Sequence, residues 1–345
     1  MPVMLSEIKE QPDWVERALA TERGSAQALA RAIRDRDVRF AVIAARGTSD
    51  NAATYAKYLI EIVSGMPVAL CAPSVYTLYD ARPSLSHTLV IGISQSGRGT
   101  DVVQVLSAAR SAGALTACIT NDGTSPITQV SDHVLLCHAG EERAVAATKT
   151  YTTALAVVAL LAATLADHRE LAAGLTTVAE TMRACLPVEE RVQQIVQRYR
   201  YMQECAVLAR GVNQATALEA ALKLTETCYV VAKPYSGADF LHGPIAMVSD
   251  GFPCMLYAPP GRAYPFMLEL ALTVRHRGAE TVVVSSEPEI LQLATVPIEV
   301  PVSVDELLSP LVYVVAGQLF ACHLSRVRGA NPDSPRGLTK VTLTR

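Results

Sequence analysis

The sequence predicts an α/β protein with two tandem domains, each a three-layer sandwich in which a five-stranded parallel sheet lies between helices. Short apolar runs alternate with segments of helical spacing, which is the pattern of a parallel sheet covered on both faces. This set of elements occurs twice, and 345 residues are enough for two domains that each bury a core. Half of the residues are hydrophobic, as is typical of chains with buried parallel sheets.

The first domain follows a helical lead, in which we expect a helix over residues 12–36. Runs rich in Val, Ile, Leu and Cys predict strands over residues 38–45, 67–72, 88–94, 115–120 and 133–137. The spacing of apolar residues between and after these runs predicts helices over residues 51–63, 101–111 and 145–165. We therefore assign residues 1–37 to the lead and 38–170 to the first domain.

A charged helical stretch without strand pattern, residues 171–200, suits a connector to the second domain, residues 201–328. There the same criteria predict strands over residues 204–209, 230–232, 253–258, 280–285 and 297–300. The predicted helices are residues 214–227, 264–277 and 310–328. Two prolines and two glycines then predict that residues 329–345 form an extended C-terminal arm.

Sequence similarity between the two domains supports a tandem duplication. Residues 45–48 (Ala-Arg-Gly-Thr) recur as 209–212 (Ala-Arg-Gly-Val), and residues 110–116 recur as 275–281 at nearly the same spacing. That spacing aligns residues 94–98 (Ser-Gln-Ser-Gly-Arg) with 258–262 (Ala-Pro-Pro-Gly-Arg). The turn is kept in the second copy, but both hydroxyls and the amide are absent, so only the first copy retains a polar loop.

This polar loop predicts a phosphate site, because it follows a buried strand and precedes a helix, where open parallel sheets bind ligands. Backbone N–H groups and the helix dipole favour an anion there. Side-chain donors come from Ser94, Gln95, Ser96 and Thr100, and Gly97 lets the backbone approach closely. The alternative is a Ser/Gly turn that only caps the helix. The loop matches neither a Walker A loop nor a G-x-G-x-x-G dinucleotide loop.

A second group of small polar residues, Gly47, Thr48 and Ser49, follows the first predicted strand. The sheet could bring it beside the phosphate loop, so that hydroxyls from two loops share one pocket. Taken alone, Thr48 and Ser49 fit the simpler role of helix N-caps.

Composition excludes several other classes of function. The formal net charge of −3 gives no basic field for nucleic acid or an acidic membrane surface. The longest apolar run, residues 152–166, is too short for a membrane span, and residues 1–11 lack the apolar core of a signal peptide. The eight cysteines form no C-x-x-C pair and the histidines lack ligand spacing. We therefore expect free thiols, a cytoplasmic location, and neither a metal nor a cofactor.

Six motifs in a fixed order make the chain resemble the sugar isomerase (SIS) family, in particular the isomerase half of glucosamine-6-phosphate synthase and its stand-alone relatives. They are Gly47-Thr48-Ser49, Ser94-Gln95-Ser96-Gly97, Val145-Ala146-Ala147-Thr148-Lys149, the helix of residues 217–226, His242-Gly243-Pro244 and Asp333-Ser334-Pro335-Arg336. The resemblance implies two SIS domains in a homodimer whose active sites are built at the subunit interface.

The resemblance also implies roles for individual residues. The loop of Ser94, Gln95 and Ser96, with Thr48, would bind the phosphate of a hexose 6-phosphate. Glu226 would be the base that moves a proton between C1 and C2, tuned by its neighbour Lys223. His242, from the neighbouring subunit, would open the sugar ring, and Lys340 in the arm would contact the open-chain carbonyl. Val145 and Ala147 would line the sugar site.

Three departures from the family pattern qualify this picture. The synthase begins with a glutaminase domain that opens on a catalytic cysteine, whereas the first cysteine here is Cys71, so we expect no ammonia supply from glutamine. The phosphate loop continues as Arg98-Gly99-Thr100, which displaces its threonine by one position. Ala147 stands where the synthase has serine, which suggests altered sugar contacts.

The residues themselves support proton transfer chemistry. Glu219, Lys223 and Glu226 form one charged stripe on a helix otherwise rich in Ala and Leu. On an isolated helix this stripe would be a solvated face, but a helix of this composition should be buried, so the stripe needs a pocket. Competition between burial and Lys223 would then set the pH range in which Glu226 accepts a proton. With Lys340 as electrophile and His242 for ring opening, the reaction needs no metal. Alone, His242 fits a turn and Lys340 an ordinary tail lysine.

Three functions follow from this reasoning. The first is conversion of glucosamine 6-phosphate to fructose 6-phosphate and ammonia, or the reverse isomerisation, by a deaminase or isomerase of SIS type. The second is a deglycase that splits fructosamine 6-phosphates into glucose 6-phosphate and an amine. The third is a non-catalytic phosphosugar sensor. A sensor would not need Glu226, His242 and Lys340, and no helix-turn-helix pattern precedes residue 38.

Overall fold

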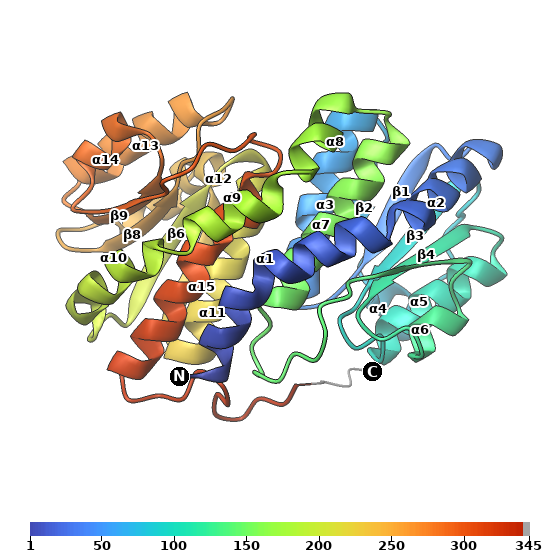
Figure 1. Cartoon of the computed structure of the whole chain (residues 1–345), viewed down its shortest axis with the longest axis horizontal. Helices are drawn as coiled ribbons and strands as arrows, with labels where there is room; N and C mark the ends of the chain where they lie inside the picture. Colours follow the sequence, from blue (N-terminus) through green and yellow to red (C-terminus); the bar gives the residue numbers. More distant parts are fainter. Residues whose placement is uncertain (341–345) are drawn as a thin grey trace. The chain divides into compact units, whose positions relative to one another are not determined.

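The computed structural model describes residues 1–340 and contains two five-stranded sheets in which all strands run parallel (Figure 1). The chain divides into two compact units. The first-sheet unit comprises Glu10–Glu142, Lys149–Thr176, Thr339 and Lys340, and the second-sheet unit comprises Met1–Lys9, Arg143–Thr148 and Thr177–Leu338. The α/β fold class with two parallel five-stranded sheets is therefore confirmed.

The first sheet has the strand order β2-β1-β3-β4-β5. Its strands are β1 (Phe40–Ala44), β2 (Val68–Leu70), β3 (Thr88–Ile93), β4 (Leu115–Thr120) and β5 (His133–Leu136). Every residue of β3 and β4 is buried, which explains their continuous apolar sequence. Because β1 lies beside β3, with Ala44 opposite Gly92, the loops that follow these two strands leave the sheet at adjacent positions.

Helices cover both faces of this sheet. Alternate strand residues such as Ala44, Val90 and Cys118 pack with α5 (Thr100–Ser111), beside α4 (Ser74–Thr77) and α6 (Pro126–Gln129). The intervening strand residues face the opposite layer, where the helices pack on one another. This layer comprises α2 (Arg23–Asp35), α3 (Thr48–Ser64) and α7 (Lys149–Leu165), and α8 (Arg169–Leu175) contacts α7.

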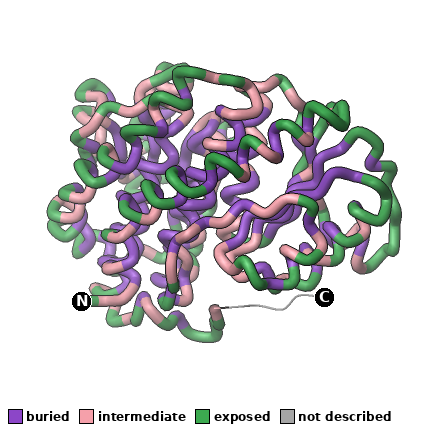
Figure 2. Tube along the Cα trace, turned by 45° about the vertical axis from the view of Figure 1, so that its right-hand side comes forward, coloured by how far each residue is buried: buried purple, intermediate pink, exposed green. Residues whose placement is uncertain are grey.

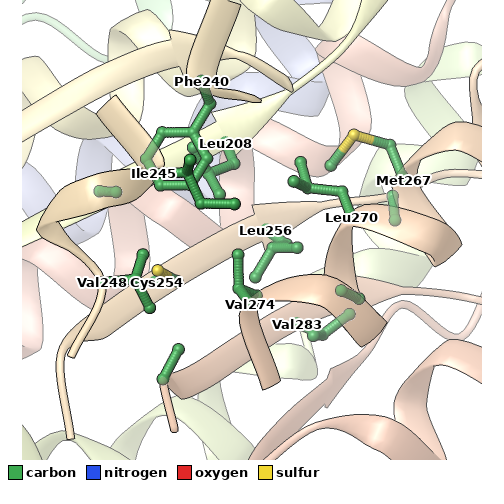
Figure 3. Close-up of a cluster of buried hydrophobic side chains, with 14 of the residues drawn as sticks. Leu208, Phe240, Ile245, Val248, Cys254, Leu256, Met267, Leu270, Val274 and Val283 are labelled. Carbon is green, nitrogen blue, oxygen red and sulfur yellow. The ribbon is translucent and has the colours of Figure 1, made fainter. Parts of the chain in front are cut away.

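The second sheet has the order β10-β9-β8-β6-β7, which is the same order when each sheet is numbered along the chain. Its strands are β6 (Glu204–Ala209), β7 (Val231–Ser236), β8 (Pro253–Tyr257), β9 (Glu280–Ser285) and β10 (Val296–Glu299). One face packs against α13 (Tyr264–His276), where Leu208, Leu256 and Val274 belong to one apolar cluster with Phe240 (Figure 3). This cluster is the core of that layer.

Other helices complete the second-sheet unit. α11 (Gln214–Cys228) lies along α15 (Ser309–Val327), which also contacts the connector helices (Figure 1). The remaining elements are α9 (Val178–Cys185), α10 (Val188–Ile195), α12 (Gly237–Leu241), α14 (Pro288–Leu293) and the short 3-10 turns Val196–Tyr199, Gly211–Asn213 and Pro244–Met247. Buried residues follow the strands and the inner helix faces (Figure 2).

Among the described residues α15 alone is long and apolar enough to cross a membrane by length and composition. However, 89% of its apolar window is buried inside the protein. The predicted apolar run at 152–166 falls within α7 and the residue after it, and it is buried along most of its length. Both helices have the burial expected of core helices.

The single helix predicted over residues 12–36 is in fact two helices, α1 (Val3–Thr21) and α2, which are divided at Glu22. Three other predicted boundaries differ from the structure by more than three residues. Helix α1 begins well before residue 12 because the Asp333 carboxylate accepts hydrogen bonds from the N–H groups of Val3 and Met4. Residues 145–148 are not helical but form a bent loop, in which the N–H of Val145 bonds to the carbonyl of Asp333 instead of to a helical partner. β7 continues past residue 232, and it tolerates Pro234 because it is an edge strand.

Candidate active site

The loop between β3 and α5 holds its polar side chains at the surface of the first-sheet unit. Ser94, Gln95 and Ser96 are half-buried. The Ser94 hydroxyl accepts a hydrogen bond from the N–H of Gly97 (3.2 Å), and the Ser96 hydroxyl accepts one from the N–H of Arg98 (3.3 Å). Each hydroxyl that accepts in this way still has its own proton to donate. The loop therefore presents two oriented O–H donors beside the first turn of a helix.

Gly97 is required at this place in the loop. Its φ of +62° lies in the left-handed region, and an added Cβ would overlap the Ser125 side chain. The chain can therefore turn tightly here only with glycine, which brings the backbone of the loop close to any bound group. Thr100, the first residue of α5, is exposed.

The neighbouring loop, after β1, is tied to the phosphate loop by an ion pair. Nε of Arg46 lies 2.7 Å from Oδ2 of Asp101, whose side chain is only 2% exposed. Asp101 also accepts the N–H of Val102 in the first turn of α5. Gly47 has a φ of +54°, and Thr48 and Ser49 open α3. Sheet topology and this ion pair thus place two loops with small polar residues at adjacent strand ends.

In the same region, burial raises the pKa of the Asp50 carboxyl, and Arg46 opposes this shift.

The equivalent loop in the second-sheet unit is filled by the chain itself. The carboxylate of Glu306 accepts hydrogen bonds from the N–H of Arg262 (2.7 Å) and of Ala263 (3.0 Å), just before α13. A Cβ at Gly261 would overlap this carboxyl group. The second loop thus already binds an anion, which is a side chain of the same protein.

The counterpart of the Arg46–Asp101 pair has also changed. Arg210, which aligns with Arg46, stacks on the ring of Phe266 at 4.2 Å from its centroid. The offset of 164 residues that aligns Arg46 with Arg210 aligns Asp101 with Pro265, the residue before Phe266. An ion pair between two loops has therefore been replaced by a cation–π contact, and the polar character of this strand end is lost in the second copy.

The charged stripe on α11 is not a solvated face. The side chains of Glu219 and Lys223 have no exposed surface, whereas that of Glu226 is 24% exposed. Nζ of Lys223 lies 2.7 Å from Oε2 of Glu226 and 3.4 Å from Oε1 of Glu219. One ammonium thus serves two carboxylates, of which only Glu226 reaches the surface. An ionised carboxylate in this position is suited to accept a proton from a bound molecule.

His242 belongs to the same unit as this stripe but to a different element. It ends α12 and is exposed, and its backbone N–H bonds to the carbonyl of Asp239 (3.1 Å). Gly243, which follows it, has a φ of +139°, a conformation that side chains rarely adopt. The backbone around His242 is therefore constrained while its imidazole remains accessible to solvent.

Lys340 is held by a residue that sequence reasoning did not identify. Its Nζ lies 2.7 Å from Oε2 of Glu142, whose side chain has no exposed surface. Nothing in the sequence distinguishes Glu142 from its neighbour Glu141, which is exposed. The one sequence signal near Glu142 is the family motif that begins three residues later, at Val145.

Two further acidic residues position the loop of Val145 and Ala147: Glu7, which sequence reasoning missed, and Asp333, which opens one of the six sequence motifs. The buried carboxylate of Glu7 accepts hydrogen bonds from the N–H of Arg143 (2.6 Å) and of Ala144 (3.3 Å). The carbonyl of Asp333 accepts the N–H of Val145 (3.1 Å). The conformation of this loop thus depends on α1 and on the C-terminal arm.

The described part of the chain offers no evident metal cluster and no readily ionised thiol. Within residues 1–340 there is no group of three or more His, Cys, Asp or Glu residues that could hold a metal ion. All eight cysteines are free, and burial raises the pKa of each thiol, for example that of Cys118 to about 11. A thiolate nucleophile at neutral pH is therefore disfavoured.

Comparison with known proteins agrees with this architecture. The SIS domain model matches residues 36–164 and 203–328, which contain the two sheets. The chain belongs to the SIS domain family. The resemblance stated from the six sequence motifs is thereby confirmed.

Relatives of this SIS protein include the glutamine–fructose-6-phosphate aminotransferase (isomerizing) of Thermococcus kodakarensis, with 35% identity over 98% of this chain and 57% of that protein. The chain thus spans little more than half the length of this relative. A solved structure of a candidate phosphosugar isomerase from Silicibacter pomeroyi DSS-3 matches with 35% identity and a TM-score of 0.87, over 96% of this chain and 100% of the other. The C-terminal domain of glucosamine–fructose-6-phosphate aminotransferase from Francisella tularensis matches with 26% identity and a TM-score of 0.86, over 96% and 98%.

Proposed function

We propose that this SIS protein is a phosphosugar isomerase that acts on an amino-sugar phosphate, converting glucosamine 6-phosphate to fructose 6-phosphate and ammonia or catalysing the reverse isomerisation. The relatives support the general activity of a phosphosugar isomerase. The amino-sugar substrate is our more specific proposal. The observation that carries it is the partly exposed Glu226 carboxylate, 2.7 Å from a lysine ammonium with no exposed surface.

The phosphate of the substrate would bind at the loop after β3. The hydroxyls of Ser94 and Ser96 and the first turn of α5 offer hydrogen-bond donors and a favourable dipole to a dianion. Thr48 and Ser49, on the adjacent strand end, would add donors from the second loop. This binding energy would hold the sugar in position without taking part in the proton transfer.

Proton transfer would then convert the open-chain aldose into the ketose form. Glu226 would remove the proton from C2 of the aldehyde form of glucosamine 6-phosphate and return it to C1, which leaves an imine at C2. Addition of one water molecule to this imine would release ammonia and give fructose 6-phosphate. His242 would assist ring opening, and the Lys340 ammonium would stabilise the negative charge that develops on the carbonyl oxygen.

We also propose a homodimer in which the neighbouring subunit supplies His242. Large apolar side chains near His242 in sequence are exposed, Leu241 and Met247 each at 41%, as expected of a surface that another copy covers. Light scattering of the purified protein tests this, and a monomer at micromolar concentration would contradict it.

The central experiment measures the products and the exchange of the C2 proton. The protein is incubated in D2O with glucosamine 6-phosphate, galactosamine 6-phosphate or a fructosamine 6-phosphate. We expect ammonia, fructose 6-phosphate and deuterium incorporation with the first substrate. Glucose 6-phosphate and a free amine from the last substrate would instead establish the deglycase, a reaction for which Ala147 leaves room because it stands where the synthase has serine.

Glu226→Gln tests the assignment of the base. We expect this variant to lose deuterium exchange at C2 by about a hundredfold or more, the usual contribution of general base catalysis, while it still binds the phosphosugar. Glu269→Gln is the matched control, because Glu269 is an exposed glutamate on α13 of the same unit. Exchange by Glu226→Gln at the rate of the control would remove Glu226 as the base, and absence of binding of any phosphosugar would refute the proposed function.

A further inference from the structure

The contact between Lys340 and Glu142 joins two parts of the chain that are 198 residues apart. The Lys340 side chain is 25% exposed, whereas that of Glu142 has no exposed surface. Both belong to the first-sheet unit. A carboxylate withdrawn from water in this way must have hydrogen-bond donors, because an uncompensated buried charge is very costly.

Two of these donors come from the start of α7. Oε1 of Glu142 accepts the N–H of Thr150 (3.0 Å), and Oε2 accepts the hydroxyl of Thr150 (2.7 Å). Lys340 supplies another donor, also to Oε2, and unlike the two groups of Thr150 it carries a charge. The carboxylate is thus held by a rigid helix, and it presents one oxygen to the arm.

The arm itself has no regular structure that could place its end. Residues 329–340 contain neither helix nor strand. Arg336 is anchored by Tyr229, because its N–H bonds to the tyrosine hydroxyl (3.0 Å) and its guanidinium stacks on the ring. Beyond Arg336 the chain reaches Lys340 through Gly337, which has a φ of +72°. The position of the Lys340 ammonium therefore depends on side-chain contacts such as that with Glu142.

We propose that Glu142 is a positioning residue for Lys340, which it holds as a docked ammonium ion at the edge of the first-sheet unit. The catalytic meaning of this inference rests on the proposed function, in which Lys340 acts on the open-chain carbonyl. In that reaction Glu142 fixes the position of the Lys340 ammonium. The docking itself is a property of the protein without substrate.

The pair differs from an ordinary surface ion pair in the burial of its carboxylate. Lys57 and Glu61 on α3 have the same separation of 2.7 Å, but both of their side chains are 37% exposed. Loss of an exposed partner is compensated by water. Loss of the Glu142 charge leaves Lys340 without its buried anchor, so its reactivity should rise. Lys57 therefore provides an internal reference within the same unit.

Trace acetylation tests the docking without any substrate. The whole protein is labelled with acetic anhydride, and the extent at each lysine is measured by mass spectrometry of its peptides. We expect Glu142→Gln to raise labelling of Lys340 by about tenfold, as expected for a charge-assisted hydrogen bond, with Lys57 unchanged. In the matched control Glu61→Gln, labelling of Lys57 should rise by less than about twofold. Unchanged labelling of Lys340 in Glu142→Gln overturns the inference.

A second variant covers the case in which Glu142→Gln fails to fold, which increased labelling of Lys57 would reveal. Thr150→Val keeps the Glu142 charge but removes one hydroxyl donor, so the carboxylate should bind Lys340 at least as firmly. We expect labelling of Lys340 in this variant to stay at or below the wild-type level. A rise as large as that expected for Glu142→Gln would show that packing around α7, not the Glu142 charge, protects Lys340, and would overturn the inference.

Kinetics then separate the positioning role from the proposed function. With glucosamine 6-phosphate we expect Glu142→Gln to lower kcat while KM stays within about twofold, because the phosphate loop is unchanged. The double variant Glu142→Gln/Lys340→Met should be no slower than Lys340→Met alone, since the two residues act as one unit. If the double variant instead lost activity by the product of the two single losses, Glu142 would not act through Lys340 and the positioning role would be overturned. An inactive wild-type protein with protected Lys340 would instead refute the proposed function and leave the docking established.

Discussion

Lys223 offers the most direct test of the charged stripe on α11, because it is a fully buried cation between two carboxylates. Replacing it by methionine keeps the apolar stem and removes only the charge. Glu219 has no exposed surface, so it cannot be rehydrated without opening the helix, whereas Glu226 is 24% exposed and can partly recover water. The main energetic cost of Lys223→Met therefore comes from Glu219.

The size of this cost follows from the geometry. For unit charges 3.4 Å apart, an effective dielectric constant of 20 gives an attraction of about 5 kcal/mol. Removal of one partner from a buried ion pair costs about 3–5 kcal/mol in general, so both routes give the same scale. The Lys57–Glu61 pair has a separation of 2.7 Å, but each of its side chains is 37% exposed, so it should contribute less than about 1 kcal/mol. Lys57→Met is therefore the matched control.

Amide hydrogen exchange measured by mass spectrometry resolves the effect by segment. We expect the free energy of opening for peptides of α11 to fall by about 3–5 kcal/mol in Lys223→Met, with α3 peptides unchanged. Adding Glu219→Gln should recover at least about 1 kcal/mol, because it removes a buried charge that has lost its Lys223 partner. The free energy of opening of α11 could instead fall by less than about 1 kcal/mol in Lys223→Met, no more than that of α3 falls in Lys57→Met. That result would refute the reasoning from burial.

Three other predictions concern single side chains. Ser96→Ala should weaken binding of glucosamine 6-phosphate by about tenfold and leave glucosamine binding unchanged in calorimetry; equal weakening of both would exclude a phosphate contact. Glu306→Ala should destabilise the protein to urea by about 1–2 kcal/mol, as loss of a helix N-cap does, whereas Asp305→Ala, on the same loop, should cost less. Burial lowers the pKa of His323 below its ordinary value of 6.5, outweighing the carboxylate of Glu189. The unfolded chain therefore binds this proton more readily than the folded protein does. The contribution of His323 to the free energy of unfolding should be fully present above pH 6.5 and should fall as the pH drops below that value. Urea titrations of His323→Gln should lack this part of the decline.

The regular elements were predictable where local sequence decides them. The strands at residues 115–120, 204–209 and 280–285 have the predicted ends, because each is a buried apolar run bounded by polar or turn residues. The repeated turn after α5 and α13 is similar in detail, since Gly113 and Gly278 both have a φ of +84°. At such positions periodicity and turn chemistry carry most of the information.

The start of α1 and the loop before α7 were not predictable from local sequence. Both depend on acidic side chains or carbonyls that come from remote parts of the chain, Asp333 for the N–H groups of Val3 and Met4 and Glu7 for the loop at Arg143. The same reason explains why Glu142 was missed. Its partner Lys340 is 198 residues away, so no pattern of spacing relates them.

The candidate site divides in the same way. The Ser94 to Gly97 loop could be located from sequence, because a strand, a polar turn and a helix follow one another and the second copy has lost the polar residues. The roles given to Glu226, His242 and Lys340 came from the family resemblance and stay predictions. Burial of Glu219 and Lys223 adds a physical reason to expect chemistry at Glu226, since a buried charged stripe has a cost that a merely structural helix would avoid.

The two copies of the loop also show why only one of them should bind a phosphosugar. In the second copy an internal carboxylate binds the N–H groups of Arg262 and Ala263. Because Glu306 is part of the same chain, its carboxylate is present at these N–H groups at a high effective concentration. A free anion would have to displace it. In the first copy the aligned N–H of Arg98 bonds to the neutral hydroxyl of Ser96 at 3.3 Å. The dianion of a phosphate can replace the Ser96 hydroxyl as acceptor of this N–H, or share the N–H with it. The first loop therefore favours an external anion, whereas the second loop binds the carboxylate of Glu306.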